Sequence, residues 1–125
     1  MQNKKGLILA IIGLLLVVGV IFIFKQNRPV GNTADNLILF YGNGCPHCEK
    51  VDAYLEANKI AEKVKIEKLE VFENQNNAKL MAEKYTACGL STVSGMGVPF
   101  LWDGGNKKCY SGDEETINFF SQWAK

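Results

Sequence analysis

Residues 37–48 constrain the fold of this chain more than any other stretch. They read Leu-Ile-Leu-Phe-Tyr-Gly-Asn-Gly-Cys-Pro-His-Cys, an apolar run followed by a glycine turn and two closely spaced cysteines. A short apolar run bounded by turn residues is typical of a buried strand. Pro46 suits the first position of a helix, because its missing N–H would have no partner there. The stretch therefore predicts a buried strand that delivers two cysteines to the start of a helix.

Position makes these cysteines reactive. Cys45 falls at the start of the expected helix, where unpaired N–H groups and the positive end of the helix dipole favour a thiolate. Cys48 lies one turn further on, within disulfide reach. His47 adds a donor and, when protonated, a positive charge that stabilises the reduced pair, which makes the disulfide a better oxidant. The residues predict a redox-active dithiol in which Cys45 is the nucleophile and Cys48 the resolving thiol, with Pro46 and His47 in the same site.

Half of a zinc site is the alternative interpretation of Cys-x-x-Cys, with Cys88 and Cys109 as the remaining ligands. Zinc sites usually contain a second closely spaced pair and lie in turns, whereas Cys88 and Cys109 are far apart in the chain. The context of strand and then helix favours the redox interpretation, so we expect no metal.

The first residues predict an appendage to one small domain. The chain has 125 residues and a formal net charge of +1, which does not suggest nucleic-acid binding. Residues 6–24 are uncharged and long enough to cross a bilayer core of roughly 30 Å. A cleaved signal peptide is the alternative, but bulky residues at 22–24 stand where small ones should mark cleavage. We expect a transmembrane anchor in residues 1–24, a tether in residues 25–35 and a domain in residues 36–125.

The orientation of this anchor is weakly encoded. Lys4 and Lys5 precede the apolar run, while Lys25 and Arg28 follow it, so the positive-inside rule leans slightly toward a cytoplasmic N-terminus. Four cysteines in a small domain fit an oxidising compartment better than the cytosol. We therefore expect a single-pass membrane protein, in contact with lipid through its anchor, whose domain faces the periplasmic or extracellular side.

Hydrophobic spacing predicts alternating strands and helices in the domain. The strand over residues 64–71 departs from regular alternation, which indicates a bulge or a change of register. Residues 74–77 are expected to form a turn, and the segment at Ser111 or Asp113 offers a helix N-cap. The remaining expected elements are a strand at 37–41, helices at 46–58 and from 78 to about 89, a strand at 98–102, a turn at 103–106, a strand at 107–110 and a last helix with Ile117, Phe120, Trp123 and Ala124 buried.

This order predicts an α/β fold, a β-α-β-α-β-β-α three-layer sandwich. Right-handed crossovers and short connections give parallel first strands, an antiparallel hairpin at the end, and helices on both faces of the sheet.

Two motifs resemble the thioredoxin-like superfamily and, by the compactness of the domain, glutaredoxin most closely. They are Cys45-Pro46-His47-Cys48 after the first strand and Gly97-Val98-Pro99-Phe100 before the hairpin. The resemblance covers residues 36–125. It implies that Cys45 attacks, that Cys48 resolves, and that Pro99 is cis and lies against the dithiol. Substrate contacts are expected at the Val98 backbone and at Tyr41, where the first strand ends.

Some positions depart from the best-known branches. Gly44 replaces the tryptophan of thioredoxin, and residues 37–41 hold no carboxylate to accept a proton. The segment 111–114, Ser-Gly-Asp-Glu, only loosely matches the glutathione-binding segment of glutaredoxins, which leaves glutathione open without strong support. Apart from the redox-active disulfide itself, no cofactor is expected. Pro-His between the cysteines is the dipeptide of the strongly oxidising periplasmic disulfide donors of bacteria.

The expected function is a membrane-anchored thiol–disulfide oxidoreductase that exchanges disulfides with protein thiols and is reset by a membrane or soluble redox partner. A glutaredoxin-like or membrane-fed reductase is one alternative. A metal-binding or metal-delivery module that uses the same cysteines is another.

Cys88 and Cys109 leave two alternatives open. An oxidising compartment rarely leaves two thiols free in a small domain, which favours a second disulfide between them. Otherwise Cys109 stays free as an auxiliary thiol near the dithiol. A bridge needs Cα atoms about 4.4–6.8 Å apart.

Overall fold

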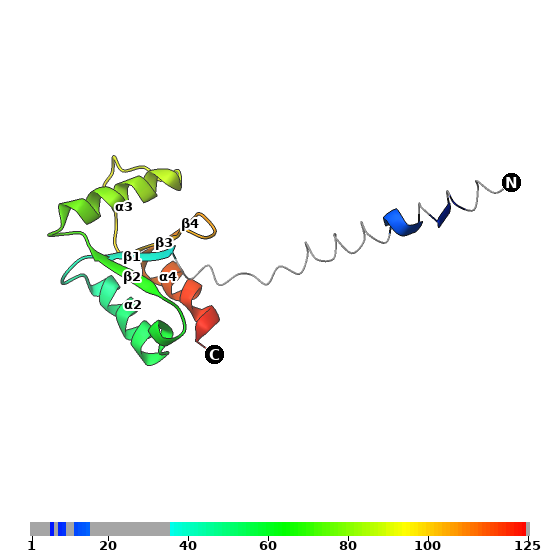
Figure 1. Cartoon of the computed structure of the whole chain (residues 1–125). Coiled ribbons are helices and arrows are strands. Elements are labelled where there is room, and N and C mark those ends of the chain that lie inside the picture. The colour runs from blue at the N-terminus through cyan, green and yellow to red at the C-terminus, as the bar shows by residue number, and fades with distance from the viewer. Residues whose placement is uncertain (1–5, 7, 10–11, 16–35, 125) are drawn as a thin grey trace. The chain divides into compact units, whose positions relative to one another are not determined.

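The computed structural model describes residue 6, residues 8–9, residues 12–15 and residues 36–124 (Figure 1). The chain divides into two units, Met1–Gly31 and Asn32–Lys125, and the account below concerns the second. Most of the expected anchor and the whole expected tether lie outside the described residues. No helix within the described part of the chain is long and apolar enough to cross a membrane.

The domain is built on one mixed four-stranded sheet in the order β2-β1-β3-β4. Strand β1 (Leu37–Tyr41) pairs in parallel with β2 (Ile66–Glu70) and antiparallel with β3 (Phe100–Asp103). Strand β3 pairs antiparallel with β4 (Lys108–Ser111), so β4 of this terminal hairpin is one edge strand of the sheet. This confirms the predicted α/β class, the parallel first strands and the antiparallel terminal hairpin.

Helices cover both faces of the sheet (Figure 1). Helices α2 (Pro46–Ala57) and α4 (Gly112–Phe120) pack on one face, and α3 (Gln75–Ala87) lies on the other. Alternation along β1 divides the core between them, because Leu37 and Leu39 face α2 and α4 while Phe40 faces α3. Two short 3₁₀ helices, η2 (Ile60–Glu62) and η3 (Ser121–Trp123), follow α2 and α4.

The helices bury apolar side chains against the sheet. Met81 and Tyr85 are buried on the inner side of α3, and Val51 and Leu55 are buried on α2. Phe120 of α4 is fully buried, with Ile117, Trp123 and Ala124 packed partly exposed against the same cluster.

Some predicted local features are wrong. The register of β1 with β2 runs one residue to one residue from Ile66 to Glu70, without a bulge. Residues 74–77 are not a turn, because the Asn74 side chain accepts hydrogen bonds from the N–H groups of Asn76 and Asn77 and so begins α3.

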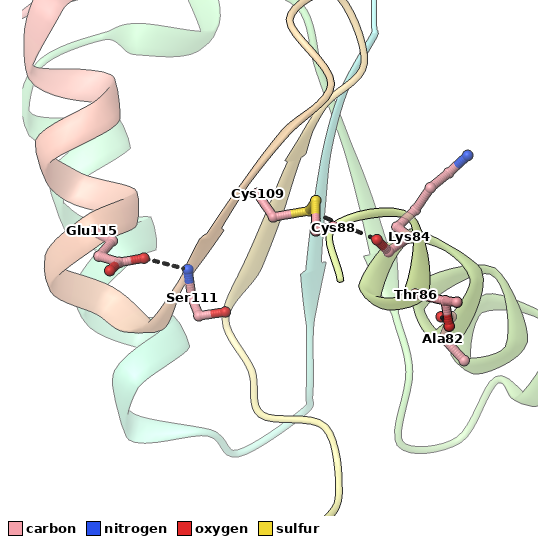
Figure 2. Close-up of a disulfide and its surroundings, with 7 residues drawn as sticks. All are labelled: Ala82, Lys84, Thr86, Cys88, Cys109, Ser111 and Glu115. Carbon is pink, nitrogen blue, oxygen red and sulfur yellow. Dashed lines mark hydrogen bonds between the residues drawn. A yellow bond between two sulfur atoms is a disulfide. The ribbon is translucent and has the colours of Figure 1, made fainter. Parts of the chain in front are cut away.

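The last helix begins after Ser111, which is the N-cap residue of α4 and one of the two residues expected to cap it. The Ser111 side chain makes no capping hydrogen bond, whereas the Ser111 backbone N–H donates to the carboxylate of Glu115 (Figure 2). Gly112, the first residue of α4, has the left-handed φ of +85° that favours glycine.

Candidate active site

Cys45 lies at the point where the sheet meets helix α2. The turn that follows β1 is closed by a hydrogen bond from Cys45 N–H to the Gly42 carbonyl at 3.2 Å, and Gly44 adopts the left-handed φ of +71° that favours glycine. Cys45 is the N-cap residue of α2, and Pro46 occupies the first helical turn. The Sγ of Cys45 accepts a hydrogen bond from the backbone N–H of Cys48 at 3.2 Å. A sulfur in this position receives the helix-terminal N–H groups that stabilise negative charge.

Cys48 is the more enclosed of the two free cysteines. The residue is 4% exposed, against 8% for Cys45, and the structure shows the pair as free thiols. Burial raises the pKa of Cys48 from 9.0 to about 12; a hydrogen bond with Cys45 adds to this rise, and one from the Gly42 backbone opposes it. Cys48 is therefore a protonated thiol at neutral pH.

The loop before β3 lies against the dithiol. The Cys45 thiol donates to the Val98 carbonyl, with Sγ and O 3.7 Å apart. The Val98–Pro99 peptide bond is cis, and the Pro99 side chain is fully buried. Pro99 in turn accepts a hydrogen bond from Gly112 N–H at 2.9 Å, which joins this loop to the start of α4. Residues far apart in the sequence thus meet around Cys45.

His47 and Lys50 share one acceptor. Nδ1 of His47 lies 3.1 Å from Oδ1 of Asp113, and Nζ of Lys50 lies 3.0 Å from Oδ2 of the same carboxylate. The hydrogen bonds from Lys50 and from His47 lower the pKa of Asp113 to about 2, so its carboxylate is ionised at neutral pH. The first turn of α4 is thereby tied to the first turns of α2.

Tyr41 lies in a surface hollow, apart from the contacts that surround Cys45. It lines an open surface hollow of about 690 Å³ together with Asn43, Glu70, Glu73 and Asn74, among others. The Nζ of Lys68 lies over its ring, 5.1 Å from the ring centroid. Tyr41 therefore borders the loop that carries the dithiol.

Glu70 organises the other side of that hollow. Its carboxylate accepts backbone N–H bonds from Phe72 at 2.8 Å and Glu73 at 2.9 Å, and longer ones from Asn74 and Asn43. Partial burial raises the pKa of Glu70, but the N–H hydrogen bonds lower it by more, so the pKa lies below its ordinary value. One carboxylate thus connects the β2–α3 turn to the loop before Cys45.

Of the two alternatives for Cys88 and Cys109, the structure has the disulfide. Their Cα atoms are 6.2 Å apart, within the range a bridge needs. Figure 2 shows the bridge joining the end of α3 to β4, with the Lys84 carbonyl oxygen 3.7 Å from Cys109 Sγ. The zinc alternative required these two cysteines as ligands, and in the described part of the chain no three His, Cys, Asp or Glu side chains are grouped to hold a metal ion.

Sequence reasoning does not identify three participants of this site. It assigns Asp113 only as a helix cap, and it assigns no role to Lys50 or Glu70. An acidic residue in the first turn of α4 indicates a cap, but no pattern in the sequence pairs it with His47 or Lys50. Glu70 ends an edge strand, and its role depends on the geometry of the turn that follows β2.

Comparison with known proteins gives no relative. No protein-family model, no curated protein and no solved structure matches this chain significantly. The site is therefore interpreted from its own geometry.

Proposed function

We propose that this chain is a thiol–disulfide oxidoreductase of the thioredoxin-like class, anchored in a membrane, that exchanges disulfides with protein thiols. The observation that carries the proposal is the asymmetry of the cysteine pair. Cys45 Sγ accepts a helix-terminal N–H bond, while Cys48 is buried with its pKa raised to about 12. The two thiols therefore differ in environment. One lies at a helix start, where N–H groups favour negative charge, and the other is buried and protonated, as attack and resolution in disulfide exchange require.

The chemistry follows from this difference. In the oxidised pair, a substrate thiolate attacks Cys45 Sγ, the Cys45–Cys48 bond breaks, and Cys48 leaves as a thiolate that takes a proton from water. A second substrate thiolate then attacks the substrate sulfur of the mixed disulfide and releases Cys45 as a thiolate. Two electrons pass from the substrate to the pair, and a reductase runs the same steps in reverse.

The Val98 backbone and Tyr41 remain our proposed substrate contacts. For Val98, the support is its carbonyl oxygen, which lies 3.7 Å from Cys45 Sγ. For Tyr41, the support is the surface hollow that it lines together with Asn43, a residue of the loop before Cys45. An extended substrate segment would use main-chain groups such as this carbonyl.

Trapping tests the proposal. Reduced Cys48→Ser should accumulate mixed disulfides with disulfide-containing substrates, because Cys45 attacks the substrate disulfide, releases one substrate thiolate and has no resolving thiol beside it. Cys45→Ser should not accumulate them. The wild-type pair should equilibrate with glutathione as a two-electron couple while the reduced protein binds no stoichiometric zinc. Tight zinc binding without such a couple would favour the metal-binding alternative.

The membrane part of the proposal is tested separately. Its support is the uncharged run at residues 6–24. Reduced intact cells expressing the chain should show domain cysteines labelled by a membrane-impermeant thiol reagent. Labelling only after lysis would place the domain in the cytosol, where a reducing role fits better.

A further inference from the structure

Asp113 connects the two helices that flank the dithiol. Its carboxylate accepts from His47 Nδ1 at 3.1 Å and from Lys50 Nζ at 3.0 Å. The Asp113 side chain is only 16% exposed, while those of His47 and Lys50 are 61% and 62% exposed. A largely enclosed acceptor therefore holds two exposed donors, one of which lies between the two cysteines.

The contact fixes the orientation of the imidazole. A carboxylate only accepts hydrogen bonds, and that of Asp113 is ionised at neutral pH, so the His47 nitrogen that faces it carries a proton. An exposed imidazole without this acceptor would rotate freely into solvent. Held by Asp113, the ring stays beside the first turn of α2, close in sequence to both sulfurs.

We infer that Asp113 is a positioning residue that holds His47 beside the dithiol and thereby raises the reduction potential of the Cys45–Cys48 pair. The inference rests on the proposed function. A protonated imidazole near Cys45 stabilises the thiolate and therefore the reduced form, and a stabilised reduced form makes the disulfide a stronger oxidant. Asp113 contributes to this only by keeping the ring in place.

The direct charge of Asp113 acts in the opposite direction. A carboxylate near a thiolate destabilises the thiolate, and loss of Asp113 would also free the positive charge of Lys50. Both direct effects predict that removing Asp113 raises the potential. Glu114 and Glu115 in the same turn add further negative charge, which the substitution leaves unchanged. A fall in the potential on removal of Asp113 therefore identifies an effect that runs through His47.

The experiment measures the glutathione equilibrium of the full chain at pH 6, where a histidine imidazolium is populated. In Asp113→Ala, which removes the acceptor, the constant for reduction of the pair should fall about tenfold, which is about 30 mV for a two-electron couple. Asp113→Glu should recover part of the loss. Glu114→Gln, which removes an exposed charge from the same turn, should leave the potential unchanged or slightly raised. In a His47→Ala background, Asp113→Ala should no longer lower it.

The outcomes separate the inference from the function. An unchanged or raised potential in Asp113→Ala, or an equal fall in the His47→Ala background, overturns the positioning role while the two-electron couple itself stands. Absence of any two-electron couple at Cys45 and Cys48 in the wild-type chain overturns the proposed function. Circular dichroism establishes that each variant is folded, and Asp113→Ser replaces Asp113→Ala if the latter does not fold.

Discussion

Cys45 and Cys88 occupy opposite ends of helices: Cys45 is the N-cap of α2, and Cys88 is the C-cap of α3. The positive end of a helix dipole stabilises a thiolate, and the negative end destabilises one. Because a stabilised reduced form makes a disulfide easier to reduce, the two cysteine pairs should differ in reducibility. The hollow around the second disulfide is also lined by Lys107 and Lys108. Their positive charges would stabilise thiolates there and so reduce the difference between the two pairs, but both side chains are exposed and screened by salt.

Stepwise reduction is therefore the first prediction. As glutathione or dithiothreitol is increased, the Cys45–Cys48 disulfide should open first and leave Cys88–Cys109 intact. Alkylation followed by mass spectrometry should find an intermediate with two labelled thiols, and peptide mapping should place both labels at Cys45 and Cys48. Labelling of Cys88 and Cys109 first, or of all four cysteines together, would contradict the argument from helix ends.

The second prediction concerns stability. The Cys88–Cys109 bridge joins residues 21 apart in the chain, and loss of a loop of this length costs ~3 kcal/mol in the chain-entropy model. Cys88→Ser with Cys109→Ser should lower the free energy of unfolding by about that amount in a urea titration. The same variant should still form a two-electron couple at Cys45 and Cys48. As a matched control, Cys45→Ser with Cys48→Ser in the oxidised protein should cost less, ~2 kcal/mol, because that pair closes only a short loop.

The fold could be predicted because its signals are local. The apolar run of β1, the proline after Cys45 and the glycine turn before β4 each identify an element from a few neighbouring residues. The start of α3 could not be placed in this way. Asparagine is common in turns as well as at helix N-caps. Only the hydrogen bonds that the Asn74 side chain accepts from the N–H groups of Asn76 and Asn77 show that it caps a helix.

Only those parts of the site whose residues are neighbours in the sequence could be predicted. Cys45 and Cys48 could be identified because a disulfide within one helical turn needs two cysteines at this spacing. The Asp113 contact with His47 depends on how α4 packs against α2, and no spacing rule relates residues on two separate helices. Tertiary packing decides which charged side chains meet in such contacts, so the spacing of residues along the sequence does not predict them.

The raised pKa of Cys48 gives the third prediction, a loss of stability of the reduced protein in alkali. The folded state holds this proton more tightly than the unfolded state, so the contribution is complete below pH 9.0 and is lost between pH 9.0 and about 12. The oxidised protein has no thiol at this position. Melting temperatures of the two forms should therefore diverge above pH 9, with the reduced form falling faster. Reduced Cys48→Ala should lack this component; an identical pH dependence of both wild-type forms would show that the Cys48 pKa is ordinary.

The last prediction concerns Glu70 on the acid side. A carboxyl group whose pKa is lowered by folding stabilises the protein above its ordinary value of 4.5, and this contribution is lost as the pH falls through the folded value. Glu70→Gln should therefore be less stable than the wild type at pH 7, and the difference should shrink as the pH falls below 4.5.

Amide exchange measures the same interaction locally. Because the Glu70 carboxylate binds the N–H groups of Phe72 and Glu73 at 2.8 and 2.9 Å, these amides should exchange faster in Glu70→Gln. Glu67→Gln removes an exposed carboxylate from the same strand and should leave them unchanged. The 3.4 Å contact with Asn43 N–H predicts a smaller change in the loop before Cys45, because that hydrogen bond is the longest that Glu70 makes. Unaltered exchange at Phe72 and Glu73 would mean that the carboxylate does not hold this turn in solution.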